Sequence, residues 1–161
     1  MKYRFVASLA SDIAELMTQY LKNGVAARLN LDPKSLLVTP VPLHFKRLNW
    51  RGFNQAEIIA RQLSNYFDWD FAANTLKRAK NKKPQADMPD RYSRIKNVQN
   101  IFKFNPAHQH GKSIDGPLTD KTVVLVDDIS TTGSTLNDCA RALKGAGAKE
   151  VIGFVFARNK I

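Results

Sequence analysis

Two adjacent carboxylates and a run of small hydroxylated residues are the part of the sequence best suited to chemistry. Asp127 and Asp128 directly follow the apolar run Val123–Val126, and a turn of Ser, Thr and Gly residues at 130–135 follows them. Carboxylates accept hydrogen bonds from the diol of a sugar, and they also coordinate Mg²⁺. A turn rich in hydroxyls that leads into a helix offers hydroxyl and backbone N–H donors to a phosphate. A sugar phosphate is the ligand that satisfies both halves of this stretch.

The flanking elements would place this stretch at the edge of a parallel sheet. The unbroken apolar run before the carboxylates predicts a strand that is buried on both faces. Leu136, Ala140, Leu143 and Ala146 follow at spacings of three and four, which predicts a helix. Open α/β sheets bind ligands where a strand, a turn and a helix N-terminus follow one another. A solvated turn without a ligand is the alternative, and the ordered combination favours a binding site.

A second strand–loop–helix unit lies earlier in the chain and carries positive charge. Ser35–Val41 predicts a strand, and a loop containing Lys46, Arg47 and Arg51 follows it. The sequence Asn54-Gln55-Ala56-Glu57 has the form of a capping box and predicts the start of a helix. The unit therefore offers cations and a helix N-terminus to an anion, although a basic surface loop with its aromatic residues packed inward is the alternative.

The stretch VVLVDDISTTGST resembles the signature of type I phosphoribosyltransferases, which bind phosphoribosyl pyrophosphate (PRPP). The resemblance implies that the acidic pair is catalytic and contacts the ribose 2′ and 3′ hydroxyls, and that the following turn holds the 5′-phosphate. The residues assigned in this way to the ribose and the 5′-phosphate are Asp127, Asp128, Ser130, Thr131, Thr132, Gly133, Ser134 and Thr135.

The run VPLHFKRLNWRGFNQAE is similar to a stretch of the ComF (also GntX) group of phosphoribosyltransferase-like proteins, which is associated with bacterial natural competence. Longer members of the group begin with a Cys-rich, zinc-binding-like module. These 161 residues contain Cys139 alone, so that module is absent from them and no zinc-dependent role is expected. In the family the loop after the first strand holds pyrophosphate, which assigns that role to Pro42, Leu43, His44, Arg47 and Arg51.

One α/β domain over residues 1–161 is expected, with a mainly parallel sheet flanked by helices, and the resemblance implies the type I phosphoribosyltransferase fold. An amphipathic helix is predicted over about 8–22, with Ser8 or Ser11 as its cap, packed on the domain. Phe71–Leu76, Asn100–Phe104 and Val151–Ala157 are predicted to be further strands of the same sheet.

The net charge of +11, from 25 Lys and Arg against 14 Asp and Glu, points to a polyanionic partner. One small ligand needs only a few cations, so the remainder favours single-stranded DNA, with solubility as the alternative explanation. A long loop over 77–94 is expected to contact nucleic acid or to reach pyrophosphate, and a merely solvated loop is equally compatible with its composition. The candidate nucleic-acid contacts are Lys46, Trp50, Lys77, Arg78, Lys80, Lys82, Lys83, Arg91 and Arg94.

The function favoured by these features is binding of PRPP in DNA uptake during natural transformation, with single-stranded DNA and proteins of the competence machinery as partners. Mg²⁺ is expected to arrive with PRPP, without direct protein ligands. The chain has no apolar run long enough to span a membrane, and it contains one cysteine. A cytoplasmic location is therefore expected. An active phosphoribosyltransferase acting on an unidentified nitrogenous acceptor and a PRPP-sensing regulator without catalysis remain as alternatives.

Overall fold

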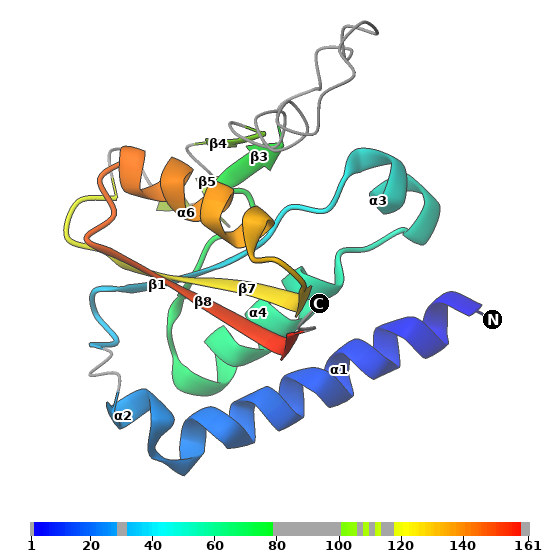
Figure 1. Cartoon of the computed structure of the whole chain (residues 1–161). Helices are drawn as coiled ribbons and strands as arrows, with labels where there is room; N and C mark the ends of the chain where they lie inside the picture. The colour runs from blue at the N-terminus through cyan, green and yellow to red at the C-terminus, as the bar shows by residue number, and fades with distance from the viewer. Residues whose placement is uncertain are drawn as a thin grey trace, which may run out of the picture.

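The computed structural model describes residues 2–28, 32–78, 101–105, 108–109, 112–113 and 118–158 of the chain. Figure 1 shows a central sheet with helices on both of its faces. In chain order the elements are α1 (Lys2–Tyr20), the π-helical turn η1 (Leu21–Val25), α2 (Ala26–Arg28), β1 (Leu36–Pro40), α3 (Phe45–Arg51), α4 (Gln55–Phe67), β2 (Asp70–Phe71), β3 (Leu76–Arg78), β4 (Phe102–Phe104), β5 (His108–Gln109), β6 (Lys112–Ser113), β7 (Thr122–Ser130), α6 (Ser134–Gly145) and β8 (Glu150–Arg158).

The main sheet has four parallel strands in the order β2-β1-β7-β8. Each crossover between paired strands carries a helix, which is how parallel neighbours are connected. Residues Val123 to Val126 of β7 are at most 3% exposed. The expectation of a parallel α/β sheet with a strand buried on both faces is therefore confirmed.

Alternate residues of β7 face two separate hydrophobic layers, because successive side chains of a strand point to opposite faces. Val123 and Leu125 pack with Leu143 of α6 on one face. Val124 and Val126 pack on the other face with side chains of α4 and α1. Cys139 lies fully buried in the α6 layer, as expected of a small packing residue. The sheet is thus the middle of three layers.

The N-terminal helix was expected over about 8–22, and α1 instead begins at Lys2. Neither candidate serine caps it; the Ser11 hydroxyl instead accepts a hydrogen bond from Gln62 of α4 at 3.1 Å. The helix ends close to the expected place, where Asn23 and Gly24 leave helical geometry and Gly24 has φ +90°. No helix in the described part of the chain is long and apolar enough to cross a membrane.

The expectation of a single sheet is wrong for the middle of the chain. The predicted strand 71–76 is broken into β2 and β3 by a turn in which the Thr75 hydroxyl donates to Ala72 O at 3.2 Å. β3 pairs in antiparallel fashion with β4, apart from the main sheet, and β5 and β6 form another short pair. Buried Asp138 of α6 anchors β4 by accepting hydrogen bonds from Ile101 N and Phe102 N at 2.8 and 3.0 Å.

Candidate functional site

The acidic pair lies near the C-terminal end of β7, which runs on through both carboxylates to Ser130. Asp127 and Asp128 are partly buried, and each accepts a hydrogen bond from the next backbone N–H. The distances are 2.9 Å from Asp128 N to Asp127 Oδ1 and 2.8 Å from Ile129 N to Asp128 Oδ1. These bonds hold both carboxyl groups in place while leaving other oxygen lone pairs available to a ligand.

The two carboxyl groups of the pair are electrostatically coupled. The pKa of Asp127 is raised from 3.8 to about 7, first by burial of its carboxyl group and second by repulsion from the neighbouring charge of Asp128. A carboxyl group with a raised pKa next to an acidic neighbour is typical of functional sites. Asp127 is therefore able to hold or release a proton near neutral pH.

The turn after β7 leads into α6, and the N-cap position of this helix makes no side-chain hydrogen bond. Gly133 precedes the helix with φ +77°, a left-handed conformation that favours glycine. Thr132 Oγ1 accepts from Ser134 N at 3.3 Å and lies 2.7 Å from Ser134 Oγ. A small cavity of about 50 Å³ is formed here; its lining consists of Asp127, Ile129, Ser130, Thr131, Thr132, Gly133, Ser134, Thr135 and Leu136. Hydroxyls and the positive end of the α6 dipole make this cavity suitable for a phosphate.

The unit at β1 approaches the acidic pair from the neighbouring strand. Val41 N donates to Val126 O at 2.8 Å, which continues the pairing of the two strands up to the carboxylates. The segment expected to be a loop contains the helix α3, so that expectation is wrong for Phe45–Arg51. Leu48 N and Gly52 N close the helical turns by donating to His44 O and Leu48 O at 2.9 and 2.7 Å.

Asn54 joins the start of α4 to the end of β1. Its Oδ1 accepts from Ala56 N at 3.2 Å, as in an N-cap, and its Nδ2 donates to Val41 O at 3.0 Å. Arg51 donates to the side-chain oxygen of Gln55. In a capping box the Glu57 side chain would accept a hydrogen bond from Asn54 N. Here it forms an ion pair with Arg61 of the same helix at 3.0 Å instead.

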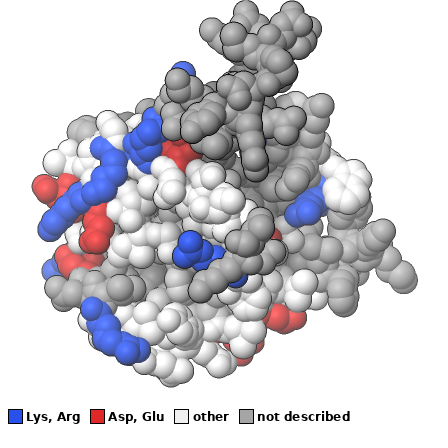
Figure 2. Space-filling model, viewed as in Figure 1, with Lys and Arg blue, Asp and Glu red and all other residues white. Residues whose placement is uncertain are grey.

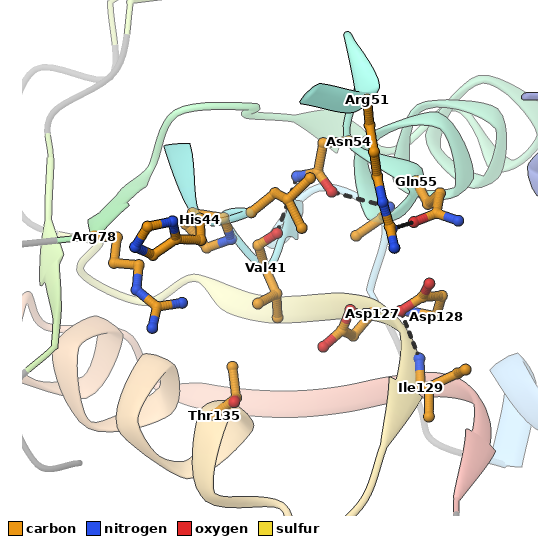
Figure 3. A pocket seen from close by; sticks show the side chains of 13 residues that line it. Val41, His44, Arg51, Asn54, Gln55, Arg78, Asp127, Asp128, Ile129 and Thr135 are labelled. Carbon is orange, nitrogen blue, oxygen red and sulfur yellow. Dashed lines mark hydrogen bonds between the residues drawn. The ribbon is translucent and has the colours of Figure 1, made fainter. Parts of the chain in front are cut away.

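A larger cavity of about 570 Å³ lies between the two units (Figure 3). In this view His44 and Arg78 stand at one end and the acidic pair at the other, with Thr135 of α6 on the side opposite α4. The lining residues are Val41, Pro42, Leu43, His44, Arg51, Asn54, Gln55, Ala56, Arg78, Asp127, Asp128, Ile129 and Thr135.

The structure brings together most residues that the sequence assigned to the site. The residues assigned to pyrophosphate line the larger cavity, except Arg47, whose side chain is not among the described ones. The residues of the turn assigned to the 5′-phosphate line the smaller cavity. Among the candidate nucleic-acid contacts, Trp50 is 69% exposed, and Lys77 and Arg78 are exposed on β3. The side chain of Lys46 and all of Lys80, Lys82, Lys83, Arg91 and Arg94 lie outside the described residues.

Three polar residues of the larger cavity, Asn54, Gln55 and Arg78, were not assigned to it from the sequence. Asn54 and Gln55 open α4, and the reasoning that placed a ligand at the start of α6 would have pointed to them as well. Arg78 was assigned to nucleic acid. It reaches the cavity because Asp138 anchors β4, β4 pairs with β3, and the Arg78 guanidinium lies 5.5 Å from the centre of the Phe102 ring. This chain of contacts leaves no local signal in the sequence.

The charged side chains of the wider surface are scattered. On the face shown in Figure 2, the described Lys and Arg side chains stand at separate places with Asp and Glu among them, and they do not form one continuous patch. Within the described residues, no three His, Cys, Asp or Glu side chains are grouped closely enough to hold a metal ion. The carboxylates of the acidic pair are hard oxygen donors that suit Mg²⁺ as part of a shell completed by ligand and water.

Comparison with known proteins identifies the family. Residues 50–161 match the phosphoribosyl transferase domain. Competence protein F of Haemophilus influenzae is 33% identical over 114 residues, 71% of this chain and 46% of that protein. The DNA utilization protein YhgH of Salmonella typhi is 27% identical over 151 residues, 94% of this chain and 61% of that protein. The chain therefore spans about half the length of the curated relatives it matches.

A solved structure gives the same answer for the fold. A hypoxanthine phosphoribosyltransferase from Staphylococcus aureus superposes with a TM-score of 0.51 and 10% identity, covering 93% of this chain and 74% of that one. The acidic pair, the turn before α6 and the cavity between the two units thus sit on a phosphoribosyltransferase fold. The chain belongs to the phosphoribosyl transferase domain family, and within it to the ComF-like proteins.

Proposed function

We propose that the chain binds PRPP across the two cavities, with the ribose where they meet. The observation that carries the proposal is that Asp127, Ile129 and Thr135 line both cavities. A ligand with its phosphate in the smaller cavity and its pyrophosphate in the larger one would place its sugar against Asp127. The hydroxyl groups of that sugar would donate hydrogen bonds to the acidic pair.

The charges of the two cavities agree with the two ends of PRPP. Arg51 and Arg78 line the larger cavity and offer positive charge to pyrophosphate. The smaller cavity offers hydroxyls and the N-terminus of α6 to a monophosphate. Mg²⁺ bound to the pyrophosphate would offset the repulsion between that group and Asp128. We therefore propose that the ion enters with PRPP and that the protein completes its coordination.

Thermal unfolding with PRPP and Mg²⁺ tests this proposal. At 100 times the dissociation constant, the ligand contributes about 2.7 kcal/mol, which raises the melting temperature by several degrees for a domain of this size. Asp127→Asn and Asp128→Asn are expected to lose most of that shift. Asp12→Asn, at an exposed carboxylate of α1, is the matched control and keeps it. The absence of a shift in the wild type, or an equal shift in Asp127→Asn, contradicts the assignment.

We also propose that the chain handles single-stranded DNA in natural transformation. The support is the net charge of +11 and two aromatic side chains on α3, Phe45 and Trp50, which are 59% and 69% exposed beside the larger cavity. Exposed aromatic rings among cations stack on the bases of single strands. The names of the relatives above, a competence protein and a DNA utilization protein, agree with such a role.

Tryptophan fluorescence can test the DNA contact directly, because Trp69 is only 8% exposed and Trp50 would report the stacking. Titration with a single-stranded oligonucleotide is expected to quench the fluorescence, with an affinity that falls as salt rises. Trp50→Ala removes this reporter, so its affinity is followed by the anisotropy of a labelled oligonucleotide, and binding should weaken by about 1–3 kcal/mol. Tyr66→Ala, which removes an exposed aromatic ring from α4, should leave the affinity unchanged. An affinity that ignores salt, or equal loss in both variants, argues against the proposed contact.

Transfer of the phosphoribosyl group is the second candidate function, and the raised pKa of Asp127 favours it. With a pKa of about 7, this carboxylate can accept a proton from a nitrogen nucleophile. In that reaction nitrogen bonds to C1 of the ribose, the bond from C1 to pyrophosphate breaks, and the proton passes to Asp127. Release of pyrophosphate over a panel of nitrogenous acceptors tests this candidate, with Asp127→Asn as the inactive variant. No release from any acceptor, while PRPP still raises the melting temperature, counts against transfer and for binding alone.

A further inference from the structure

Strand β8 forms one edge of the main sheet and has no partner on its outer side among the described residues. It is nine residues long, whereas β2 at the other edge has two. The seven residues from Val151 to Ala157 contain neither a charge nor a proline. Long edge strands of this kind invite pairing with another strand, and proteins normally block them with charged residues, prolines or a cover. The edge therefore has the properties of a strand that is paired in the working protein.

The sequence of β8 is complementary to itself. A strand that pairs with its own copy across a two-fold axis runs antiparallel to it. If Phe154 lies on the axis, Glu150 of each copy stands opposite Arg158 of the other. Both of these side chains are exposed, and neither forms an ion pair within the described chain. The pairing would therefore join opposite charges at both ends of the seam.

The side chains between those ends also match. In the same register Ile152 faces Phe156 of the second copy, and the two Phe154 rings face each other. Phe154 packs with the layer of α1 and α4, so alternation puts these pairs on that face of the sheet. Aromatic and β-branched residues opposite one another stabilise antiparallel strands by about 0.2–1 kcal/mol for each pair. On the other face, Val151 meets Ala157 and Gly153 meets Val155.

Helix α1 extends this apolar surface beside the strand. Its buried stripe faces the core, and one flank faces α4, where Ser11 accepts the hydrogen bond from Gln62. Tyr20 lies on the opposite flank and stacks on Phe154 with ring centres 6.4 Å apart. The exposed apolar side chains of that flank and of the neighbouring strand are Leu9 at 47%, Leu16 at 55%, Tyr20 at 60% and Phe156 at 45%. Two copies joined at β8 would bring these flanks toward each other on one side of the seam.

We propose that two copies of this chain form a symmetric dimer by antiparallel pairing of β8 with β8. The two four-stranded sheets become one continuous sheet, and Glu150 and Arg158 set its register. No residue of β8 lines either cavity of the candidate site, so both copies keep an open site. The dimer and the binding of PRPP are therefore independent of each other.

Charge reversal at the two ends of β8 tests the proposal by sedimentation analysis. Glu150→Arg and Arg158→Glu each place two like-charge pairs at the seam, and each should weaken the dimer at least about tenfold. The double variant Glu150→Arg/Arg158→Glu restores opposite charges and should dimerise like the wild type. An equimolar mixture of the two single variants should also form dimers, because every pair across that seam is again opposite in sign.

Two further variants separate loss of pairing from loss of folding. Phe156→Lys puts a charge in the apolar part of the edge and should yield a monomer with an unchanged circular dichroism spectrum. Lys149→Glu reverses an exposed charge just before β8 and should leave the dimer intact. A wild type that sediments as a monomer at every concentration overturns the proposal. So does a dimer that neither single charge reversal weakens, or a mixture of the single variants that stays monomeric.

Discussion

The two strand–turn–helix units that meet at the cavity begin their helices in opposite ways. At α4 the side chain of Asn54 caps the helix and also ties it to Val41 of β1. At α6 the residue before the helix is Gly133, which has no side chain, and of the preceding turn Thr132 Oγ1 accepts from Ser134 N at 3.3 Å. A helix N-terminus closed by its own cap serves the fold, whereas one left open is available to an anion. The difference favours α6 over α4 as the helix start that takes the phosphate in the proposed PRPP complex.

The two units also differ in the charges that they contribute to the cavity. The β7–α6 unit contributes Asp127 and Asp128, which suit the hydroxyls of a sugar, while the β1–α4 unit contributes Arg51, which suits an anion. Neither unit alone has both properties. The neighbouring positions of β1 and β7 in the sheet bring them to one cavity.

Closing the open helix with a charged side chain should have the largest effect. Asp and Asn both tolerate the left-handed conformation at Gly133, so Gly133→Asp and Gly133→Asn differ mainly in charge. A negative charge in the small cavity should lower the affinity for PRPP by at least about 100-fold relative to the asparagine variant. Calorimetric titration with PRPP and Mg²⁺ measures the ratio. Equal affinities of the two variants would show that the phosphate lies elsewhere.

Ionisation of Asp127 should give the next effect, which appears in the stability of the protein without any ligand. The pKa of Asp127 is raised in the folded protein from 3.8 to about 7, so the folded chain holds this proton more tightly than the unfolded chain. The free energy of unfolding should therefore fall as pH rises from about 4 to about 7 and then level off. Unfolding by denaturant at several pH values in this range measures the slope of the free energy of unfolding against pH. Asp127→Asn should flatten it and be the more stable protein above about pH 7; an unchanged slope contradicts this assignment.

Removal of the cap from α4 should have the smallest effect on the ligand and a moderate one on the fold. Asn54→Ala removes the N-cap and the bond to Val41 O, which should lower the free energy of unfolding by about 1–2 kcal/mol. Asn54→Asp keeps an acceptor for Ala56 N and loses the donor to Val41, so it should lie between the alanine variant and the wild type. If Asn54→Ala loses more free energy of PRPP binding than of unfolding, the start of α4 also serves the ligand, and the proposed difference between the two helix starts is contradicted.

Local patterns in the sequence predicted the parts of the site that lie close together along the chain. The apolar run before Asp127, the small residues of the turn and the helical spacing after it act within a few residues of one another. The structure has β7, the turn and α6 in that order, with the turn residues lining one cavity. The same holds for β1 and α4, since a short apolar segment and a capping residue are also local signals.

Contacts between distant segments were not predictable in this way. The segment 71–76 has the composition of one strand, yet the Thr75 turn divides it, and its second half leaves the main sheet to pair with β4. The helix α3 likewise forms in a segment that was expected to be a loop. In both cases tertiary contacts and backbone hydrogen bonds decided between conformations that local composition left close in energy.

The sequence by itself predicted the residue groups proposed to form the site: an acidic pair at a strand end, a hydroxylated turn before a helix, and a basic segment after another strand. Residue type and short-range spacing are sufficient for that. The tertiary structure alone decided that Asp127 joins two cavities, that Arg78 reaches the larger one through Asp138 and β4, and that β8 is an edge. The order of strands in a sheet depends on pairing between segments far apart in the chain, and local sequence does not encode that pairing.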